Sequence, residues 1–362
     1  MTATKARRTG AVIGMITLAA TSLAACSDGS GGAATESGSV RVASPAPDSL
    51  FTYNEMVARE LGFYADEDLE VELVALSDAI PAAALVQNGE ADAALISATD
   101  ALAAASKAED LRLAYDERTG GTDFIYGIVV PSESGIEDLT ELEGENIGLA
   151  SPDQDLALLA SALEQVDMTL DDVETTVVGP GGSSVAESLR SGRIAGYAGT
   201  LQDFAAFGDA GLEVDNILPE GLEGLPVGGY VTTTSTLEAD DDMVKFLRAL
   251  AKGTYVALER PEIAALVTQE GAPEQWREPE VAEFLLEGLA ATLVPFDGET
   301  FGEIKTDRWQ NAQDLLIEVG VMDDPADLDV LLDDDLIEEI NDWDREEVLA
   351  RADEWLAEHG AS

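Results

Sequence analysis

Short apolar segments typical of β-strands alternate with helical patterns along this chain, and the alternation begins twice. The first series has strand patterns at 40–43, 69–74, 91–97 and 111–115, with helical patterns at 50–61 and 80–88. The second has strand patterns at 124–130, 146–150, 174–178 and 194–198, with helical patterns at 154–166 and 185–191. This alternation is typical of βαβ units, so we expect α/β folding with parallel sheets covered by helices on both faces.

The order of these patterns predicts a second lobe inserted into a first. Another β-rich segment follows at 228–234, and nearly everything from 240 onward has a helical pattern. Segments 124–130 and 230–234 are candidates for two strands that cross between the lobes. Two α/β lobes joined twice form a hinged pair, and such sheets bind ligands at the carboxyl ends of their strands. The expected divisions are lobe 1 at 40–125, lobe 2 at 126–230, the helical return of lobe 1 at 231–335, and an acidic helical extension at 336–362.

The amino-terminal residues have the layout of a secretory signal peptide. Lys5, Arg7 and Arg8 precede an apolar stretch at 11–23, which is too short for a membrane span. The sequence LAAC at 23–26 resembles the bacterial lipobox, in which the cysteine is lipidated and becomes the first mature residue. We therefore expect 1–25 to be a lipoprotein signal peptide and Cys26 to be lipidated. The small, polar residues at 26–39 predict a flexible linker. The alternative is an ordinary signal peptide with a chance cysteine.

The charge of the chain excludes some partners. Asp and Glu number 73 against 19 Lys and Arg, which gives a net charge of −54. A body this acidic repels nucleic acid and anionic lipid surfaces. The excess could form an acidic pocket for a cationic ligand, or it could be a general surface adaptation, for example to high salt. The acids are spread from Glu36 to Glu358, which favours the second interpretation.

Residue usage argues against several kinds of catalysis. Cys26 is the only cysteine, and the only histidine, His359, lies in the polar tail. The body therefore has no disulfide or thiolate, and chemistry that pairs a nucleophile with histidine, or ligates zinc through it, is poorly supported. We expect a protein that is not an enzyme and that needs no cofactor and no metal.

Several motifs carry a resemblance that covers about 45–330. They are GFYADEDLEVEL at 62–73, NGEADAA at 88–94, LTELEGENIG at 139–148 and LRSGRIAG at 189–196. They resemble the "GFF…EGLDVEL", "SGEVDFG", "ADLKGKKIG" and "LxSGxVDA" segments of periplasmic solute-binding proteins of the nitrate/sulfonate/taurine and thiamine-pyrimidine type. Ala195 stands where those relatives usually have an acid, and the later helices at 244–249, 261–264 and 301–320 also resemble theirs. The acidic tail after about 335 lies outside the pattern.

The resemblance implies a two-lobed type II periplasmic-binding-protein fold with two hinge crossovers and a ligand cleft between the lobes. It also implies a substrate-binding lipoprotein of an ABC importer, held on the outer face of the cell membrane by lipid at Cys26, as in Gram-positive bacteria. Its partners would be a small-molecule ligand and the permease subunits, and we expect a monomer. The alternatives are an enzyme of the same fold acting on a pyridoxal- or pyrimidine-type substrate, and a surface interaction module without a ligand.

Candidate ligand contacts are polar residues at predicted strand carboxyl ends and helix amino ends. In lobe 1 they are Ser44, Tyr53, Asn54, Ser77, Asp78, Ser97, Thr99 and Asp123. In lobe 2 they are Ser151, Asp153, Gln154, Ser183, Ser184 and Thr200, with Asp155, Gln202 and Asp203 nearby, and Tyr230 lies at the return crossover. As alternatives, Thr99, Ser151 and Ser183 are plain helix caps, and Tyr53 and Tyr230 are core aromatics.

The candidate set also bears on the charge of the ligand. The loop GPGGSS at 179–184 lacks the lysine of a phosphate-binding loop, although its free amides are able to bind a ligand oxygen. The set contains several acids and no Lys or Arg, and the nearest base is Arg118. A sulfonate or nitrate would then depend on helix amino ends and neutral donors. A neutral or cationic heterocycle, such as a thiamine-type pyrimidine stacked on Tyr53 or Tyr230, fits at least as well.

Overall fold

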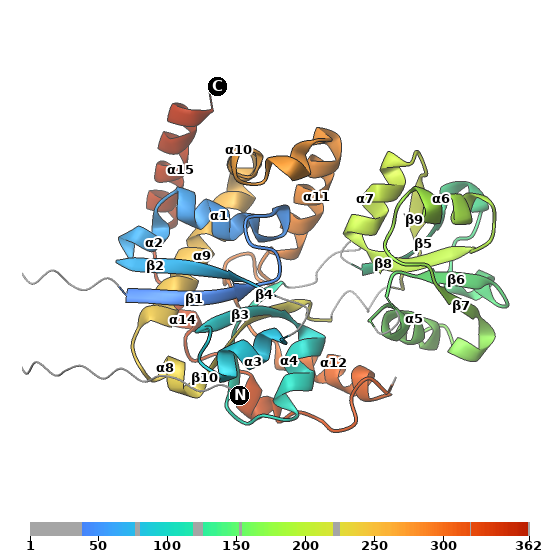
Figure 1. Ribbon diagram of the computed structural model, residues 1–362, viewed down its shortest axis with the longest axis horizontal. Coiled ribbons are helices and arrows are strands. Elements are labelled where there is room, and N and C mark those ends of the chain that lie inside the picture. Colours follow the sequence, from blue (N-terminus) through green and yellow to red (C-terminus); the bar gives the residue numbers. More distant parts are fainter. Residues whose placement is uncertain are drawn as a thin grey trace, which may run out of the picture. The chain divides into compact units, whose positions relative to one another are not determined.

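The fold was analysed in a computed structural model, which describes residues 38–76, 80–118, 126–151, 154–219, 225–318 and 320–360. The predicted signal peptide, Cys26 and nearly all of the predicted linker lie outside these ranges, as do Ser77, Asp78, Asp123 and Asp153. Within the ranges there are two five-stranded sheets, ordered β2-β1-β3-β10-β4 and β7-β6-β8-β5-β9. Helices cover both faces of each sheet (Figure 1), so the two-lobed α/β fold is confirmed.

The first sheet is mixed. Its strands are β1 (Gly38–Ser44), β2 (Leu69–Ala75), β3 (Ala93–Ser97), β4 (Leu111–Arg118) and β10 (Gly228–Thr233). Strand β1 is parallel to β2 and β3, whereas β10 is antiparallel to both β3 and β4. The expectation of a parallel sheet is wrong here. The chain leaves the sheet at the carboxyl end of β4 and re-enters it, as β10, at that same end. The returning strand must therefore run in the opposite direction.

Two layers of helices enclose the first sheet. One core lies under α1 (Tyr53–Glu60), α2 (Phe63–Asp66), α9 (Asp242–Glu259), α10 (Pro261–Gly271) and α11 (Pro279–Thr292). The core on the other face lies under α3 (Ala82–Gln87), α4 (Ala98–Ala105), α12 (Thr306–Glu318) and α13 (Leu328–Leu331). Shorter elements are η1 (Leu50–Thr52), η5 (Pro273–Trp276) and α8 (Thr234–Leu237). Among the described residues after 240, the regular elements are helices and one 3₁₀ turn.

The second sheet is also mixed and draws on one continuous stretch of sequence. Its strands are β5 (Tyr126–Pro131), β6 (Asn146–Leu149), β7 (Glu174–Val177), β8 (Gly196–Thr200) and β9 (Val214–Asn216). Strand β6 is parallel to β7 and β8, and β5 is antiparallel to β8 and β9. Helix α5 (Gln154–Glu164) covers one face, and α6 (Ser183–Arg190) and α7 (Leu201–Asp209) cover the other. The 3₁₀ turns η2 (Ser132–Ser134), η3 (Leu139–Leu142) and η4 (Leu170–Asp172) complete this lobe.

The chain passes between the sheets twice, once between β4 and β5 and once between β9 and β10. Neither of the strands that we expected to cross does so. Strand β5 pairs only with strands of the second sheet, and β10 pairs only with strands of the first.

The carboxyl-terminal segment belongs to the first lobe. It contains α14 (Ile337–Ile340) and α15 (Arg345–His359), and Ile340, Val348 and Ala352 are buried in the core under α9. Ion pairs join it to the rest of the lobe: Asp353 pairs with Arg260, Arg351 with Asp66, and Glu339 with Arg248. Arg248 and Lys252 also pair with Glu67. Bases that are scarce in this chain are thus concentrated where the last helix packs.

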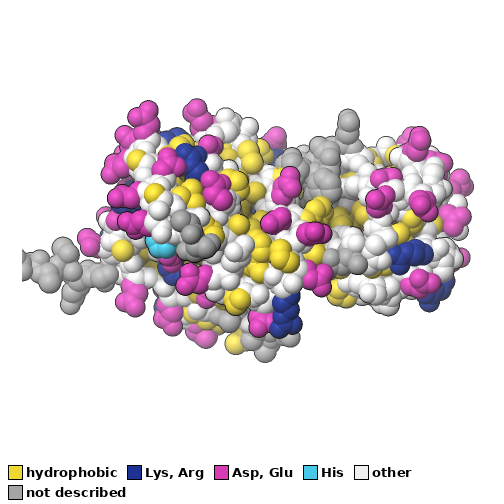
Figure 2. All heavy atoms as spheres, turned by 90° about the horizontal axis from the view of Figure 1, so that it is seen from above, with side chains coloured by type: hydrophobic (Ala, Val, Ile, Leu, Met, Phe, Trp, Pro, Cys, Tyr) yellow, Lys and Arg dark blue, Asp and Glu magenta, His cyan; other side chains and the backbone are white. Residues whose placement is uncertain are grey.

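The surface and the helix lengths bear on two sequence-based interpretations. Figure 2 shows Asp and Glu side chains scattered over the visible face, with few Lys and Arg among them. This distribution fits a general acidic surface better than one acidic pocket. Across the ranges that the structure describes, no helix has the length and apolar character needed to cross a bilayer.

Candidate functional site

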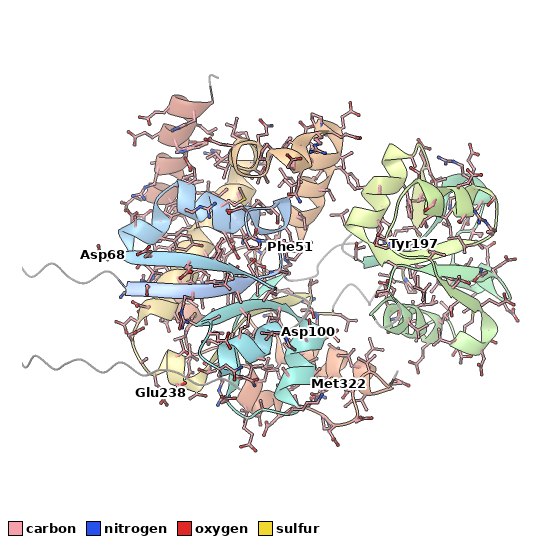
Figure 3. The ribbon with its side chains drawn as sticks, viewed as in Figure 1. Phe51, Asp68, Asp100, Tyr197, Glu238 and Met322 are labelled. Carbon is pink, nitrogen blue, oxygen red and sulfur yellow. The ribbon has the colours of Figure 1, made fainter. Side chains whose placement is uncertain are left out.

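The carboxyl ends of the first-sheet strands carry several of the predicted polar residues. Ser97 ends β3 and caps α4: its Oγ accepts a hydrogen bond from the Asp100 amide at 3.1 Å and donates one to the Asp100 carboxylate at 2.8 Å. Thr99 is half-buried in the first turn of α4, and the capping residue is Ser97, so the alternative of a Thr99 cap is wrong. Figure 3 shows Phe51 and Asp100 at the same end of the first lobe. The carboxyl end of β3 is therefore a polar surface.

Four other candidates of the first lobe are core residues. Ser44, Tyr53, Asn54 and Tyr230 are each at most 1% exposed. The Tyr230 ring packs edge-on against Phe246 and Tyr115, and its hydroxyl donates a hydrogen bond to the Glu55 carboxyl group. Tyr53 and Tyr230 therefore match the alternative of core aromatics, with no ring face open for stacking. The Ser44 Oγ atom has no hydrogen-bond partner among the described residues.

A buried charged pair ends strand β4. Glu117 and Arg118 have side chains that are 1% and 2% exposed, and Arg118 Nε lies 3.3 Å from Glu117 Oε2. A second bond to Glu117 comes from Asn54, whose Nδ2 donates to Oε1 at 2.9 Å and also contacts Thr254 Oγ1 at 3.1 Å. A register shift between β4 and β10 at this point indicates a bulge. Each charge is thus held by a partner in the core, as burial requires.

Phe51 is a candidate ligand contact that the sequence analysis missed. Its half-buried ring lies over the Arg118 guanidinium, 4.1 Å from centroid to Cζ, and its backbone oxygen accepts a hydrogen bond from Arg118. Arg118 also donates to Thr292 Oγ1 at 3.1 Å. An aromatic ring fixed over a buried cation and only partly covered can stack on a planar ligand. The sequence offered little to single out Phe51, because it stands at the start of a predicted helix only two residues before Tyr53, the aromatic residue that was chosen there.

Two buried carboxyl groups in the first lobe, Glu55 and Asp116, have raised pKa values. Burial raises the pKa of Glu55 to about 8, against a hydrogen bond from Tyr230 that lowers it. Burial also raises the pKa of Asp116 to about 7, and the hydrogen bond from Trp309 Nε1 at 3.0 Å opposes the shift. Both groups are enclosed in the core, so we regard them as structural.

In the second lobe, loops after β7 and β8 converge on one carboxylate. Asp203 Oδ1 accepts a hydrogen bond from the Gly181 amide at 2.5 Å. Its Oδ2 accepts from the amide and the hydroxyl of Thr200, at 2.8 Å and 2.9 Å. The Tyr197 hydroxyl donates to the Gly179 oxygen at 3.0 Å, which fixes the other end of the glycine loop. Figure 3 shows Tyr197 within this lobe.

A second carboxylate, Asp155, lies near the start of α5. It accepts a hydrogen bond from the Ser151 amide at 2.5 Å. Burial is the main cause that raises its pKa, and the charge of Asp203 adds to the rise.

The remaining predicted residues of the second lobe lie at the same edge. Ser151 and Thr200 are half-buried, and Ser183 and Ser184 are exposed in the first turn of α6. The capping residue of α6 is Gly182, which provides no side-chain bond, so Ser183 is not the helix cap. The side chain of Gln154 lies outside the described parts of the chain. His359 is exposed near the end of α15, stacked on Trp355 with ring centroids 4.3 Å apart.

Taken together, each sheet presents hydroxyls, amides and carboxylates at the carboxyl ends of its strands. Such an edge can bind a small polar molecule by hydrogen bonds. The sequence placed Ser97, Thr99, Ser151, Ser183, Ser184 and Thr200 at these edges, and the structure places them there. It did not anticipate that Phe51 lies beside the first edge, or that Asp203 joins two loops of the second.

Comparison with known proteins gives the family and the fold. Residues 52–264 match the family model described as NMT1/THI5 like. No curated protein sequence matches the chain. The periplasmic aliphatic sulphonate-binding protein SsuA of Escherichia coli superposes with a TM-score of 0.63 at 15% identity, over 81% of this chain and 91% of that one.

Two further solved structures show how broadly the fold is used. The alkanesulfonate-binding protein SsuA of Xanthomonas axonopodis, bound to MOPS, gives a TM-score of 0.56 at 18% identity, over 79% of this chain and 94% of that one. The desulfurization enzyme DszB gives a TM-score of 0.59 at 13% identity, over 84% of this chain and 98% of that one. Binding proteins and an enzyme therefore share this fold.

Proposed function

Because the chain belongs to the NMT1/THI5-like family, we propose that it is an extracytoplasmic substrate-binding lipoprotein of an ABC importer. It captures a small organic solute between its lobes and delivers it to a membrane permease. The observation that carries the proposal is the pair of polar strand edges, one on each lobe of a fold whose solved relatives include SsuA proteins.

The solute is a thiamine-type pyrimidine or another heterocycle, or a sulfonate-like compound. Phe51 would stack on a planar ring, in place of Tyr53 and Tyr230. The hydrogen-bonding candidates are the predicted polar residues at the carboxyl ends of both sheets, together with those that lie outside the described residues: Ser77, Asp78, Ser97, Thr99, Asp123, Ser151, Asp153, Gln154, Ser183, Ser184 and Thr200. Support for the described members of this set is positional, since each lies at a strand end or at a helix start.

A thermal-shift panel of pyrimidines, riboflavin-like compounds, amines, sulfonates and nitrate tests the proposal. We expect one class to stabilise the folded protein, by about 2.7 kcal/mol at a hundred times its dissociation constant. Phe51→Leu should weaken that shift for a planar ligand more than Phe296→Leu, which removes an aromatic ring that is partly exposed and also stacks on an arginine. No shift with any compound would favour a surface module that binds no small ligand.

A second candidate function is catalysis by an enzyme of the same fold, because the desulfurization enzyme DszB shares this fold. Any compound that stabilises the protein is then incubated with it and recovered. Conversion of that compound into a product would replace transport by catalysis, whereas unchanged recovery is the result we expect of a binding protein.

The anchor makes a separate prediction. Cys26→Ser should move the protein from the membrane fraction to the soluble or shed fraction, because the residue that carries the lipid is lost. Fractionation of cells followed by immunoblotting measures the change. Ser27→Ala is the matched control and should remain with the membrane. If the Cys26→Ser protein still sediments with membranes, the lipid anchor is not at Cys26.

A further inference from the structure

We propose that Asp203 serves as an internal anion of the second lobe and makes the binding site reject oxyanionic solutes. The transported solute is then neutral or cationic where it meets this lobe. The inference rests on the proposed function, since it assigns a ligand class to the same site, and it selects between the two classes left open above.

The first step concerns hydrogen-bond donors. Backbone amides at helix starts and in glycine loops are the donors that a protein without nearby lysine or arginine offers to a sulfonate or phosphate. In this lobe two such amides, those of Gly181 and Thr200, already donate to the Asp203 carboxylate, and the Thr200 hydroxyl does so as well. A third, the Ser151 amide, donates to Asp155. An incoming oxyanion would have to displace a carboxylate of the protein to reach them.

The second step concerns how closely the backbone is built around Asp203, which is 6% exposed. A Cβ added at Gly181 would lie 2.5 Å from Asp203 Cα, and one added at Gly199 would lie 2.8 Å from Asp203 Oδ2. Only glycine allows these approaches. Within α7 the bonds to Thr200 form an ordinary capping box, but the bond from Gly181 comes from a different loop. Asp203 therefore does more than cap its own helix.

The third step concerns charge. Asp155 and Asp203 place two carboxyl groups at this edge. Arg118, the base at the end of β4, is paired with Glu117 and bonded to Phe51 and Thr292. Like charges disfavour an anion at this end of the sheet.

The experiment measures binding of methanesulfonate and inorganic sulfate by isothermal titration calorimetry. The proteins are the full-length mature chain, Asp203→Asn, Asp203→Ser and, at the second carboxylate, Asp155→Asn. Asp171→Asn is the matched control, because it makes the same charge change on an exposed residue at the opposite edge of the same lobe. Circular dichroism melting establishes which variants fold.

We expect no binding of either anion to the unmodified protein or to the Asp171→Asn control. At least one folded Asp203 variant should bind them more tightly by at least about tenfold. Methanesulfonate binding by the unmodified protein would overturn the inference. So would folded Asp203 variants that gain nothing. If neither Asp203 variant folds, Asp155→Asn must bind the two anions more tightly than the unmodified protein does. If Asp155→Asn then shows no tighter binding, the inference is overturned.

Failure of this inference is distinguishable from failure of the proposed function. Suppose that neutral or cationic compounds stabilise the protein in the thermal-shift panel but the variants do not gain anion binding. The proposed transport function is then supported, and the proposed role of Asp203 is contradicted. If no compound of any charge binds, the proposed function falls whatever the variants do.

Discussion

Replacing Arg118 with methionine should destabilise the protein by about 3–5 kcal/mol, because the Glu117 carboxylate would remain buried without its cation. The Glu117 and Arg118 side chains are 1% and 2% exposed, so solvent does not replace the lost partner. The substitution also removes the donors to Thr292 and to the Phe51 backbone. Urea unfolding followed by circular dichroism measures the change in the free energy of unfolding.

Two further variants make this result specific. Arg112→Met changes the same residue type on the same strand at a half-buried position, and it should cost less than about 1 kcal/mol. The double variant Glu117→Gln, Arg118→Met leaves no unpaired charge and should recover much of the loss. A single-variant loss below that of Arg112→Met would show that the pair is not buried as described.

Glu55→Gln should stabilise the protein at alkaline pH and have little effect in acid. The pKa of Glu55 is raised by burial from 4.5 to about 8. Between these values the unfolded chain loses the proton and the folded chain keeps it, so the stability of the unmodified protein falls as the pH rises. A glutamine side chain can accept the hydrogen bond from the Tyr230 hydroxyl, and it has no carboxyl proton to lose as the pH rises. The gain should therefore grow from about zero near pH 4 to on the order of 2–4 kcal/mol near pH 8.

Unfolding free energies of both proteins at several pH values check this, with equal salt throughout. Glu70→Gln, an exposed position on β2, is the matched control and should shift stability by less than about 0.5 kcal/mol. A difference between Glu55→Gln and the unmodified protein that does not change with pH would mean that Glu55 ionises as readily in the folded protein as in the unfolded chain.

Most elements were predictable because they depend on local pattern. The alternation at 69–74 became β2, the run at 174–178 became β7, and the pattern at 185–191 became α6. The direction of a strand within its sheet could not be predicted in the same way, because it does not depend on local pattern. Strand β10 runs against its neighbours because the chain leaves the first sheet at the carboxyl end of β4 and re-enters it at that same end. Strand β5 is also antiparallel to its neighbours, and nothing in the residues of either strand records its direction.

The site was harder to predict because polar residues occur both at binding edges and in satisfied cores. Tyr53 and Asn54 were candidates because they stand near a predicted helix start, but α1 is enclosed by α9, α10 and the sheet. Likewise the strand pattern at 111–115 seemed to stop at charged residues, whereas β4 continues through Arg118. Those charges find partners in distant segments, at Asn54, Thr292 and Trp309, and a single sequence does not reveal such partners.

The positions of the strands along the sequence set the order in which a growing chain can complete its two lobes. All five strands of the second sheet lie between 126 and 216, so that lobe can form from one uninterrupted stretch of newly made chain. The first sheet lacks its β10 strand until residue 233 has been made, and its core lacks Val348 and Ala352 until the last helix emerges. A ribosome delivers the amino end first. The lobe that begins first is therefore the last to be finished, and its apolar faces need protection for nearly the whole time of synthesis.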